Sequence, residues 1–355
     1  MFEEQTYEAI LDRMLDRGSD LIDKREGSVF YDAVAPASLE IAQAYWELEN
    51  VMNEGFADTA SYEYLARRAA ERYIYPHEAT FAIVKARFAP ENIEIPDGTR
   101  FNLGEFNYIV MNRLSEGFYR MQCETAGSQP NGSLGELTPI DYIDGLAYGE
   151  ITEVLILGEN EETVDEFRKR YLESFDDQPA NGNIAWYKQT LTDLQGVGGV
   201  KVLRAWNGPG TVKCIIQNSE YGIPSEELLG KVQTQIDPEV NHGEGIGLAP
   251  IGHTVTIAGV TGETLNITST FTLEVGTQWE DVKTSLEKLV DDYFKELNTD
   301  WENLDNIVVR ISQMETRFLG VVGVVDVENT LINGTASNFV VSSEKIPVRG
   351  SVLNG

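Results

Sequence analysis

Three histidines, His77, His242 and His253, are the residues of this chain best suited to acid–base chemistry or zinc binding. None of them lies within one helical turn of another histidine or of a cysteine along the sequence. Zinc sites and catalytic histidine–carboxylate pairs need several such groups brought together. We therefore interpret all three histidines as loop residues and predict no metal site around them.

The glycine-rich stretch from His242 to Gly247 places its glycines two residues apart. It lacks the GxGxxG spacing of a dinucleotide-binding turn and lies between a predicted helix and a predicted strand, so we interpret it as a loop. Acidic pairs such as Asp176-Asp177 and Asp291-Asp292 have the residue type that serves glycoside cleavage or cation binding. With 58 acidic residues in the chain, such pairs arise by chance. The sequence also lacks the Walker, HExxH, GxSxG and EF-hand spacings, so we predict no enzyme activity and no cofactor.

The composition sets the size and the charge of the protein. Its 355 residues suffice for two or three domains that each bury a core. The chain has 27 Lys and Arg against 58 Asp and Glu, a formal net charge of −31, and such a surface repels nucleic-acid phosphates. Two cysteines occur, Cys123 and Cys214, which are too few for a disulfide framework, and both are predicted to be free, buried thiols.

The sequence predicts neither a secretory signal nor a membrane-spanning helix. The sequence begins Met1-Phe2-Glu3-Glu4-Gln5 and lacks the basic and then apolar order of a secretory signal. No apolar run approaches the roughly 18 residues of a membrane-spanning helix. We therefore expect the chain to fold in a cytoplasm, without membrane insertion.

The first 75 residues carry apolar side chains at helical spacing and no clear strand pattern. One stripe precedes a break at Gly27-Ser28, and a second, partly aromatic stripe follows it. A third helix is predicted over residues 59–72, from a cap at Asp58 or Thr59. The first two stripes comprise, in order, Tyr7, Ile10, Leu11, Met14 and Leu15, and then Leu39, Ala42, Tyr45, Trp46, Glu49 and Met52.

After Pro76 the pattern changes to short strands between Gly, Pro and Asn turns, which predicts a β-rich domain. Residues 161–260 follow with two helices, a strand pair joined by Asn207-Gly208-Pro209-Gly210, a third helix and a strand. Residues 261–355 show strands around a helix at 278–297. The fold class is therefore α+β multidomain, with an N-terminal α-helical region (1–75), a central β-rich domain (76–160) and two C-terminal α+β domains (161–260 and 261–355). The last domain has predicted strands at 265–273, 307–311, 321–327, 339–341 and 346–348.

A series of short motifs, spread over most of the chain, resembles the baseplate J-like proteins of contractile phage tails and phage-tail-like bacteriocins. Each motif alone is weak, because Gly, Pro and Asn recur in any turn-rich protein, but their shared order supports the resemblance. In sequence order they are Glu26-Gly27-Ser28, Tyr31-Asp32, Ala35-Pro36, Phe56-Ala57-Asp58-Thr59-Ala60, Tyr64-Leu65, Ile95-Pro96-Asp97-Gly98-Thr99, Glu161-Glu162-Thr163 with Asp165-Glu166 and Arg168, Arg170-Tyr171-Leu172, Asn181-Gly182-Asn183 before Trp186-Tyr187, Gly196-Val197-Gly198, Trp206 to Val212, and Ala249-Pro250-Ile251-Gly252.

The resemblance implies a mechanical function. It implies a structural wedge protein that associates through its N-terminal helices, joins a ring around the tail hub and links that ring to the sheath. Its partners would be a second copy in a homodimer and other baseplate wedge, hub and sheath-initiator proteins. They would assemble in a bacterial cytoplasm into a phage virion or a released tail-like particle. The alternative is a receptor- or carbohydrate-binding tail protein, for which a fibre-like stem or an exposed aromatic tip is expected.

The second helical stripe carries more large apolar surface than a lone helical hairpin leaves in water. Aromatic residues are common anchors of protein interfaces, so we predict that residues 1–75 bind another chain. The candidate interface residues are Tyr31, Tyr45, Trp46, Met52, Phe56, Tyr62 and Leu65.

Overall fold

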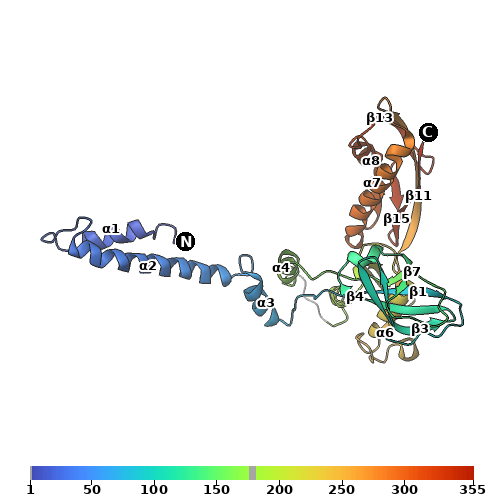
Figure 1. Ribbon diagram of the computed structural model, residues 1–355, viewed down its shortest axis with the longest axis horizontal. Coiled ribbons are helices and arrows are strands. Elements are labelled where there is room, and N and C mark those ends of the chain that lie inside the picture. Colours follow the sequence, from blue (N-terminus) through green and yellow to red (C-terminus); the bar gives the residue numbers. More distant parts are fainter. Residues whose placement is uncertain (1, 176–180) are drawn as a thin grey trace. The chain divides into compact units, whose positions relative to one another are not determined.

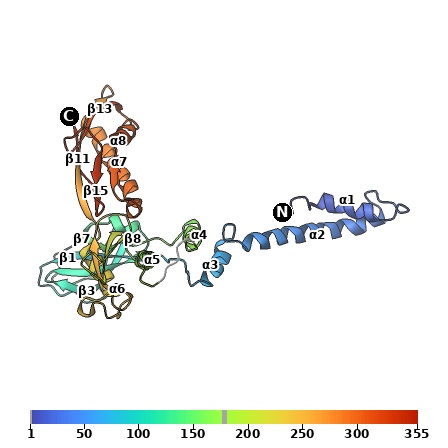
Figure 2. The ribbon, with the colours of Figure 1, turned by 180° about the vertical axis from the view of Figure 1, so that it is seen from behind.

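The computed structural model describes residues 2–175 and 181–355 (Figures 1 and 2), and within them it contains eight α-helices and fifteen strands. The chain forms two compact units. The first contains the chain up to Glu78 and a later segment that begins at Glu162. The second contains Ala79–Glu161 and the remainder of the chain. The predicted α+β multidomain class is confirmed.

The first unit is entirely helical apart from its connecting segments. Helices α1 and α2 form an antiparallel hairpin, and each begins at a hydroxyl cap: Ala9 N donates to Thr6 Oγ1 (3.3 Å) and Tyr31 N to Ser28 Oγ (3.2 Å). The turn before Ser28 uses Gly27 at φ 83°, a conformation that favours glycine. The helices of this unit are α1 (Tyr7–Arg17), α2 (Val29–Glu54), α3 (Tyr62–Ala70) and α4 (Val164–Glu173).

Helix α4 packs on α3, although about ninety residues of chain separate them. Leu65 and Ala69 of α3 contact Phe167 and Tyr171 of α4 in one small buried core. From the sequence, α4 and the helix that follows it were both assigned to the α+β domain of residues 161–260. The structure instead groups α4 with the N-terminal helices.

The second unit begins with a seven-stranded sheet of order β5-β7-β1-β4-β3-β2-β6, whose principal neighbours are antiparallel. Buried side chains alternate along β1, as expected for a sheet with one face on a core. Strands β2 and β3 pair as a hairpin around Gly104, whose φ is 60°. The strands are β1 (Phe81–Ala89), β2 (Arg100–Leu103), β3 (Phe106–Ser115), β4 (Phe118–Ala126), β5 (Gly135–Glu136), β6 (Thr138–Pro139) and β7 (Tyr148–Ile156), with a 3-10 turn at Gln129–Gly132.

The next region packs two helices against a three-stranded sheet of order β10-β9-β8, in which β10 is parallel to β9. The predicted hairpin between β8 and β9 is confirmed, and its turn holds Gly208 at φ 102° and Gly210 at φ 78°. The elements are α5 (Ile184–Thr192), β8 (Val197–Arg204), β9 (Thr211–Asn218), α6 (Glu226–Ile236), a 3-10 turn at Glu239–Asn241 and β10 (Thr254–Gly259).

The last region contains the largest core of the molecule, formed where α7 covers the sheet β13-β11-β15. The prediction of a strand over 307–311 was only partly right, because β12 ends at Val309 and a further helix, α8, follows it. The elements are β11 (Thr261–Leu273), α7 (Trp279–Thr299), a 3-10 turn at Trp301–Asn303, β12 (Ile307–Val309), α8 (Ile311–Phe318), β13 (Val324–Ile332), β14 (Phe339–Val341) and β15 (Lys345–Asn354).

Polar contacts join the three regions of the second unit. Gln195 Nε2 donates to the Phe81 carbonyl (3.2 Å), which ties the middle region to the seven-stranded sheet. Lys201 Nζ donates to the carbonyls of Leu304 (2.7 Å) and Ser343 (2.8 Å), which ties the middle region to the last one. These bonds satisfy backbone carbonyls where the regions of this compact unit meet.

Candidate assembly interface

Helix α1 covers one face of α2. The hydroxyl of Ser38 is fully buried there, 3.1 Å from Met14 Sδ, and the Phe2 and Tyr45 rings lie 5.5 Å apart. Because α1 has 11 residues and α2 has 26, the shorter helix leaves much of the longer one uncovered. The hairpin therefore buries only part of the apolar surface of α2.

Two further stripes run along α2, one on each side of the covered face. The first stripe is exposed and consists of Ala37, Ile41, Ala44, Leu48 and Val51, at alternating spacings of four and three. The second has the same spacing and consists of Ala35, Leu39, Ala42 and Trp46. Spacings of four and three are those of the heptad a and d positions that face a partner helix in a coiled coil. All residues of the first stripe are exposed, with Val51 at 67%. In the second stripe Leu39 and Trp46 are exposed, with Trp46 at 65%, whereas Ala35 and Ala42 are partly buried.

The predicted interface residues fall into two groups. On α2 and just beyond it, Trp46 and Phe56 are exposed, whereas Tyr31, Tyr45 and Met52 are partly covered by the hairpin. On α3, Tyr62 lies at the rim of the α3–α4 core, with its ring 6.3 Å from that of Phe167. Leu65 is 0% exposed and belongs to that core, where it contacts α4.

Two arginines of α4 bind segments of the chain far away in sequence. Arg168 donates from Nε to the Ala57 carbonyl (3.0 Å) and from Nη2 to the Ala60 carbonyl (2.7 Å), which holds the loop between α2 and α3. Arg170 donates from Nη2 to the Tyr75 carbonyl (2.7 Å), just after α3. The sequence motif around these arginines therefore has a structural role that the sequence alone does not reveal.

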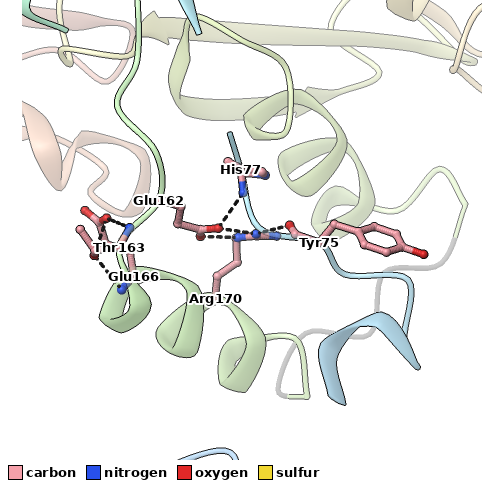
Figure 3. A network of polar contacts seen from close by, with 6 residues as sticks. All are labelled: Tyr75, His77, Glu162, Thr163, Glu166 and Arg170. Atoms are coloured by element: carbon pink, nitrogen blue, oxygen red, sulfur yellow. Dashed lines mark hydrogen bonds and ion pairs between the residues drawn. The ribbon is translucent and has the colours of Figure 1, made fainter. Parts of the chain in front are cut away.

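Glu162 and Arg170 form the centre of the network in Figure 3. The guanidinium of Arg170 contacts both carboxylate oxygens of Glu162, at 2.8 and 2.7 Å, and the same carboxylate accepts the backbone N–H of His77 (3.1 Å). Thr163 and Glu166 close a capping box at the start of α4. This network fastens the chain before β1 to the start of α4.

Burial alone would raise the pKa of Glu162. The hydrogen bonds from Arg170 and from the His77 backbone outweigh this effect and lower the pKa below its usual value. Only 9% of the Glu162 side chain is exposed, so its negative charge is held by partners rather than by water. The network is therefore most stable when the Glu162 carboxylate is ionised.

The histidines lie in three separate environments. His253 Nδ1 is 2.8 Å from the Tyr187 hydroxyl, and His242 Nδ1 is 2.7 Å from Asp237 Oδ2. Among the described residues, no group of three or more His, Cys, Asp or Glu side chains is placed to hold a metal ion. Of the two acidic pairs considered above, Asp176-Asp177 lies outside the described residues and Asp291 is paired with Arg349.

Both cysteines are free and buried, as predicted. Burial raises the pKa of the Cys214 thiol to about 12, so this group is a protonated core residue at neutral pH. None of the helices in the described segments is both long enough and apolar enough to cross a membrane.

Comparisons with known proteins agree with the motifs. The Baseplate J-like central domain matches residues 179–259 and the Baseplate J-like protein C-terminal domain matches residues 265–354. Two proteins of Bacillus subtilis (strain 168) match over 99% of this chain and 98% of their own length: the uncharacterized protein YqbT at 39% identity and the phage-like element PBSX protein XkdT at 38%. A cryo-EM structure of the anti-feeding prophage baseplate aligns over 99% of this chain and 100% of its own, with 11% identity and a TM-score of 0.40.

The two domain matches support a structural role in a phage-type baseplate. The chain belongs to the baseplate J-like family. The first matched domain begins after α4, which is consistent with the position of α4 in the helical unit.

Proposed function

We propose that this chain is a baseplate wedge subunit that associates through α2 with a second copy and with another wedge component. Its later domains would contribute to a ring around the tail hub and link that ring to the sheath. The observation that carries this proposal is the pair of apolar stripes on α2, because a helix with exposed large apolar side chains on two sides has room for two more helices. The relative named as a phage-like element protein supports a place in a phage or tail-like particle.

Two partners on α2 are proposed because its two stripes differ in character. The stripe with Ile41, Leu48 and Val51 is aliphatic, as in regular helical pairing. The stripe with Leu39 and Trp46 carries the bulky aromatic residue that often dominates the binding energy of an interface. One stripe would pair with the second copy and the other with the further wedge component.

Sedimentation of the purified full-length chain tests this proposal. The parent is expected to dimerise, and Trp46→Ala is expected to weaken association by about 2 kcal/mol. Gln43→Ala is the matched control, because Gln43 is exposed on the polar back of the same helix. A parent that stays monomeric at high concentration, or a Trp46→Ala variant that both sediments and enters particles as the parent does, would contradict the proposal.

Complementation of particle assembly tests the same helix in its native setting. Deletion of residues 2–54 removes α1 and α2 but keeps Ala57 and Ala60, which bind α4. We expect this shortened chain to fold and to be absent from assembled particles. Normal particles that contain the shortened chain would remove the hairpin from the assembly mechanism.

A further inference from the structure

The loop between α6 and β10 exposes apolar side chains to an unusual degree. It follows α6 at the edge of the second unit (Figures 1 and 2) and carries Val240, Ile246, Leu248 and Ile251. Val240 is 93% exposed and Ile251 is 82% exposed. Connecting loops are usually polar, and clustered exposed apolar residues commonly mark interaction sites.

A buried carboxylate fixes the conformation of this loop. Asp237 is 1% exposed and accepts three hydrogen bonds, from His242 Nδ1 (2.7 Å), Gly243 N (3.0 Å) and Val255 N (2.8 Å). These donors lie in the first half of the loop and at the start of β10, so one carboxylate joins both ends of the loop.

The second half of the loop is anchored to the end of α6. Leu248 N donates to the Gln235 carbonyl (3.0 Å) and Ala249 N to the Ile236 carbonyl (2.9 Å). Gly247 lies so close to the Ile236 carbonyl that an added Cβ would be 2.3 Å from it. The backbone is therefore held in place while the apolar side chains point to solvent, and a pre-organised surface loses little entropy on binding.

The loop and its neighbours in sequence carry acidic side chains and no Lys or Arg. The sequence has no Lys or Arg from residue 232 to residue 282, whereas Glu239 and Glu244 lie within the loop itself. A second copy of the chain would bring the same carboxylates and a net charge of −31 to the contact. Complementary potentials favour association, and like charges oppose it.

We propose that the loop 239–251 is a docking surface for a different protein chain, which presents an apolar segment flanked by Lys or Arg. The apolar side chains supply the buried contact. Glu239 and Glu244 favour a partner whose apolar segment is surrounded by Lys or Arg. This surface is separate from α2 and does not depend on the association proposed there. In the particle, it gives the chain a partner in addition to those proposed for α2.

Photo-crosslinking in native particles tests this inference. A photoreactive amino acid replaces Val240 or Ile251, one at a time, in the full-length chain, and Val275 serves as a matched exposed control. We expect crosslinks from the two loop positions, and not from the control, to one peptide of another particle chain that has Lys or Arg beside apolar residues. Crosslinks to a second copy of this chain, or to an acidic peptide, would overturn the proposal.

Charge reversal provides the second measurement. The double substitution Glu239→Lys and Glu244→Lys is expected to lower the crosslink yield by at least about fivefold, because it opposes the basic rim. The control is Glu105→Lys with Glu116→Lys, two exposed turn residues of the seven-stranded sheet region. Equal yields from parent and loop variant, with unchanged melting temperatures, would refute the selection of a basic partner. Loss of association through α2 with retained loop crosslinks would refute only the α2 proposal.

Discussion

Helices α2 and α7 are both long and both carry periodic apolar residues, yet they differ in what covers them. Helix α7 has 21 residues, and Val282, Leu286, Val290, Tyr293 and Phe294 lie in the core that it forms with its own sheet. Helix α2 has 26 residues, and Ser38 is the one fully buried position among them. Periodicity shows which face of a helix is apolar, but it does not show whether the same chain covers that face.

This difference determines whether the apolar side chains of each helix stabilise the folded chain or the assembly. A fully buried Leu or Val side chain contributes roughly 1.5–3 kcal/mol relative to leaving it in water. The α7 side chains make this contribution when the chain folds. The exposed stripes of α2 make it only when another helix covers them, so they are expected to stabilise the assembly rather than the monomer.

The largest expected effect on stability is that of a substitution in α7, the buried helix. Leu286 on α7 is 0% exposed, within the largest core. Leu286→Ala should lower the free energy of unfolding by about 3 kcal/mol, because it removes buried methyl groups and leaves a cavity. Urea denaturation followed by tryptophan fluorescence measures the change. An unchanged midpoint would show that α7 is not held by this core.

Helix α4 provides an intermediate case, because it is short but anchored by charged groups. Arg170→Ala removes the partner of Glu162 and should destabilise the helical unit by about 2 kcal/mol. Lys169→Ala is the control, since Lys169 lies on the exposed side of α4, 3.8 Å from Glu173. Limited proteolysis between α3 and β1 reports on the helical unit alone, and equal cleavage of both variants would argue against the role of the network.

The pH dependence of the same network gives a smaller effect. The folded-state pKa of Glu162 is lowered, so its contribution to stability is present above the unfolded pKa of about 4.3 and is lost as pH falls through the folded pKa. The stability difference between the parent and Glu162→Gln should therefore be constant near neutral pH and shrink in acid below about pH 4. A difference that grows as the pH falls would contradict this assignment.

Much of the fold follows from local patterns in the sequence. The helix α7 and the turn at Gly208 and Gly210 were predicted because apolar spacing and turn residues are local signals. The packing of α4 on α3 was not predicted, because it depends on contacts between residues distant in sequence, such as Leu65 with Phe167. Helix α8 was missed because its eight residues directly follow a strand-like run.

The candidate interface stays a prediction, and its residues lie in different surroundings. The aromatic stripe with Trp46 was found from its composition, and its exposure agrees with a role in binding. Leu65 has the same local pattern but lies in a core that α4 completes. The loop with Val240 and Ile251 was interpreted only as a loop, because nothing in its sequence shows that Asp237 holds it in a single conformation.

The smallest expected effect on stability is also the sharpest test of the comparison. Leu48 on α2 is exposed in the hairpin, so Leu48→Ala removes few contacts within the chain and should change the free energy of unfolding by less than about 0.5 kcal/mol. The same substitution shortens an apolar side chain at the centre of the proposed helical seam, so it should weaken self-association or particle entry. Unfolding is measured at a protein concentration where the parent is monomeric. Sedimentation is measured at higher concentrations, where the parent associates. If Leu48→Ala destabilises the monomer as much as Leu286→Ala does, α2 is covered within its own chain and the two helices do not differ as described.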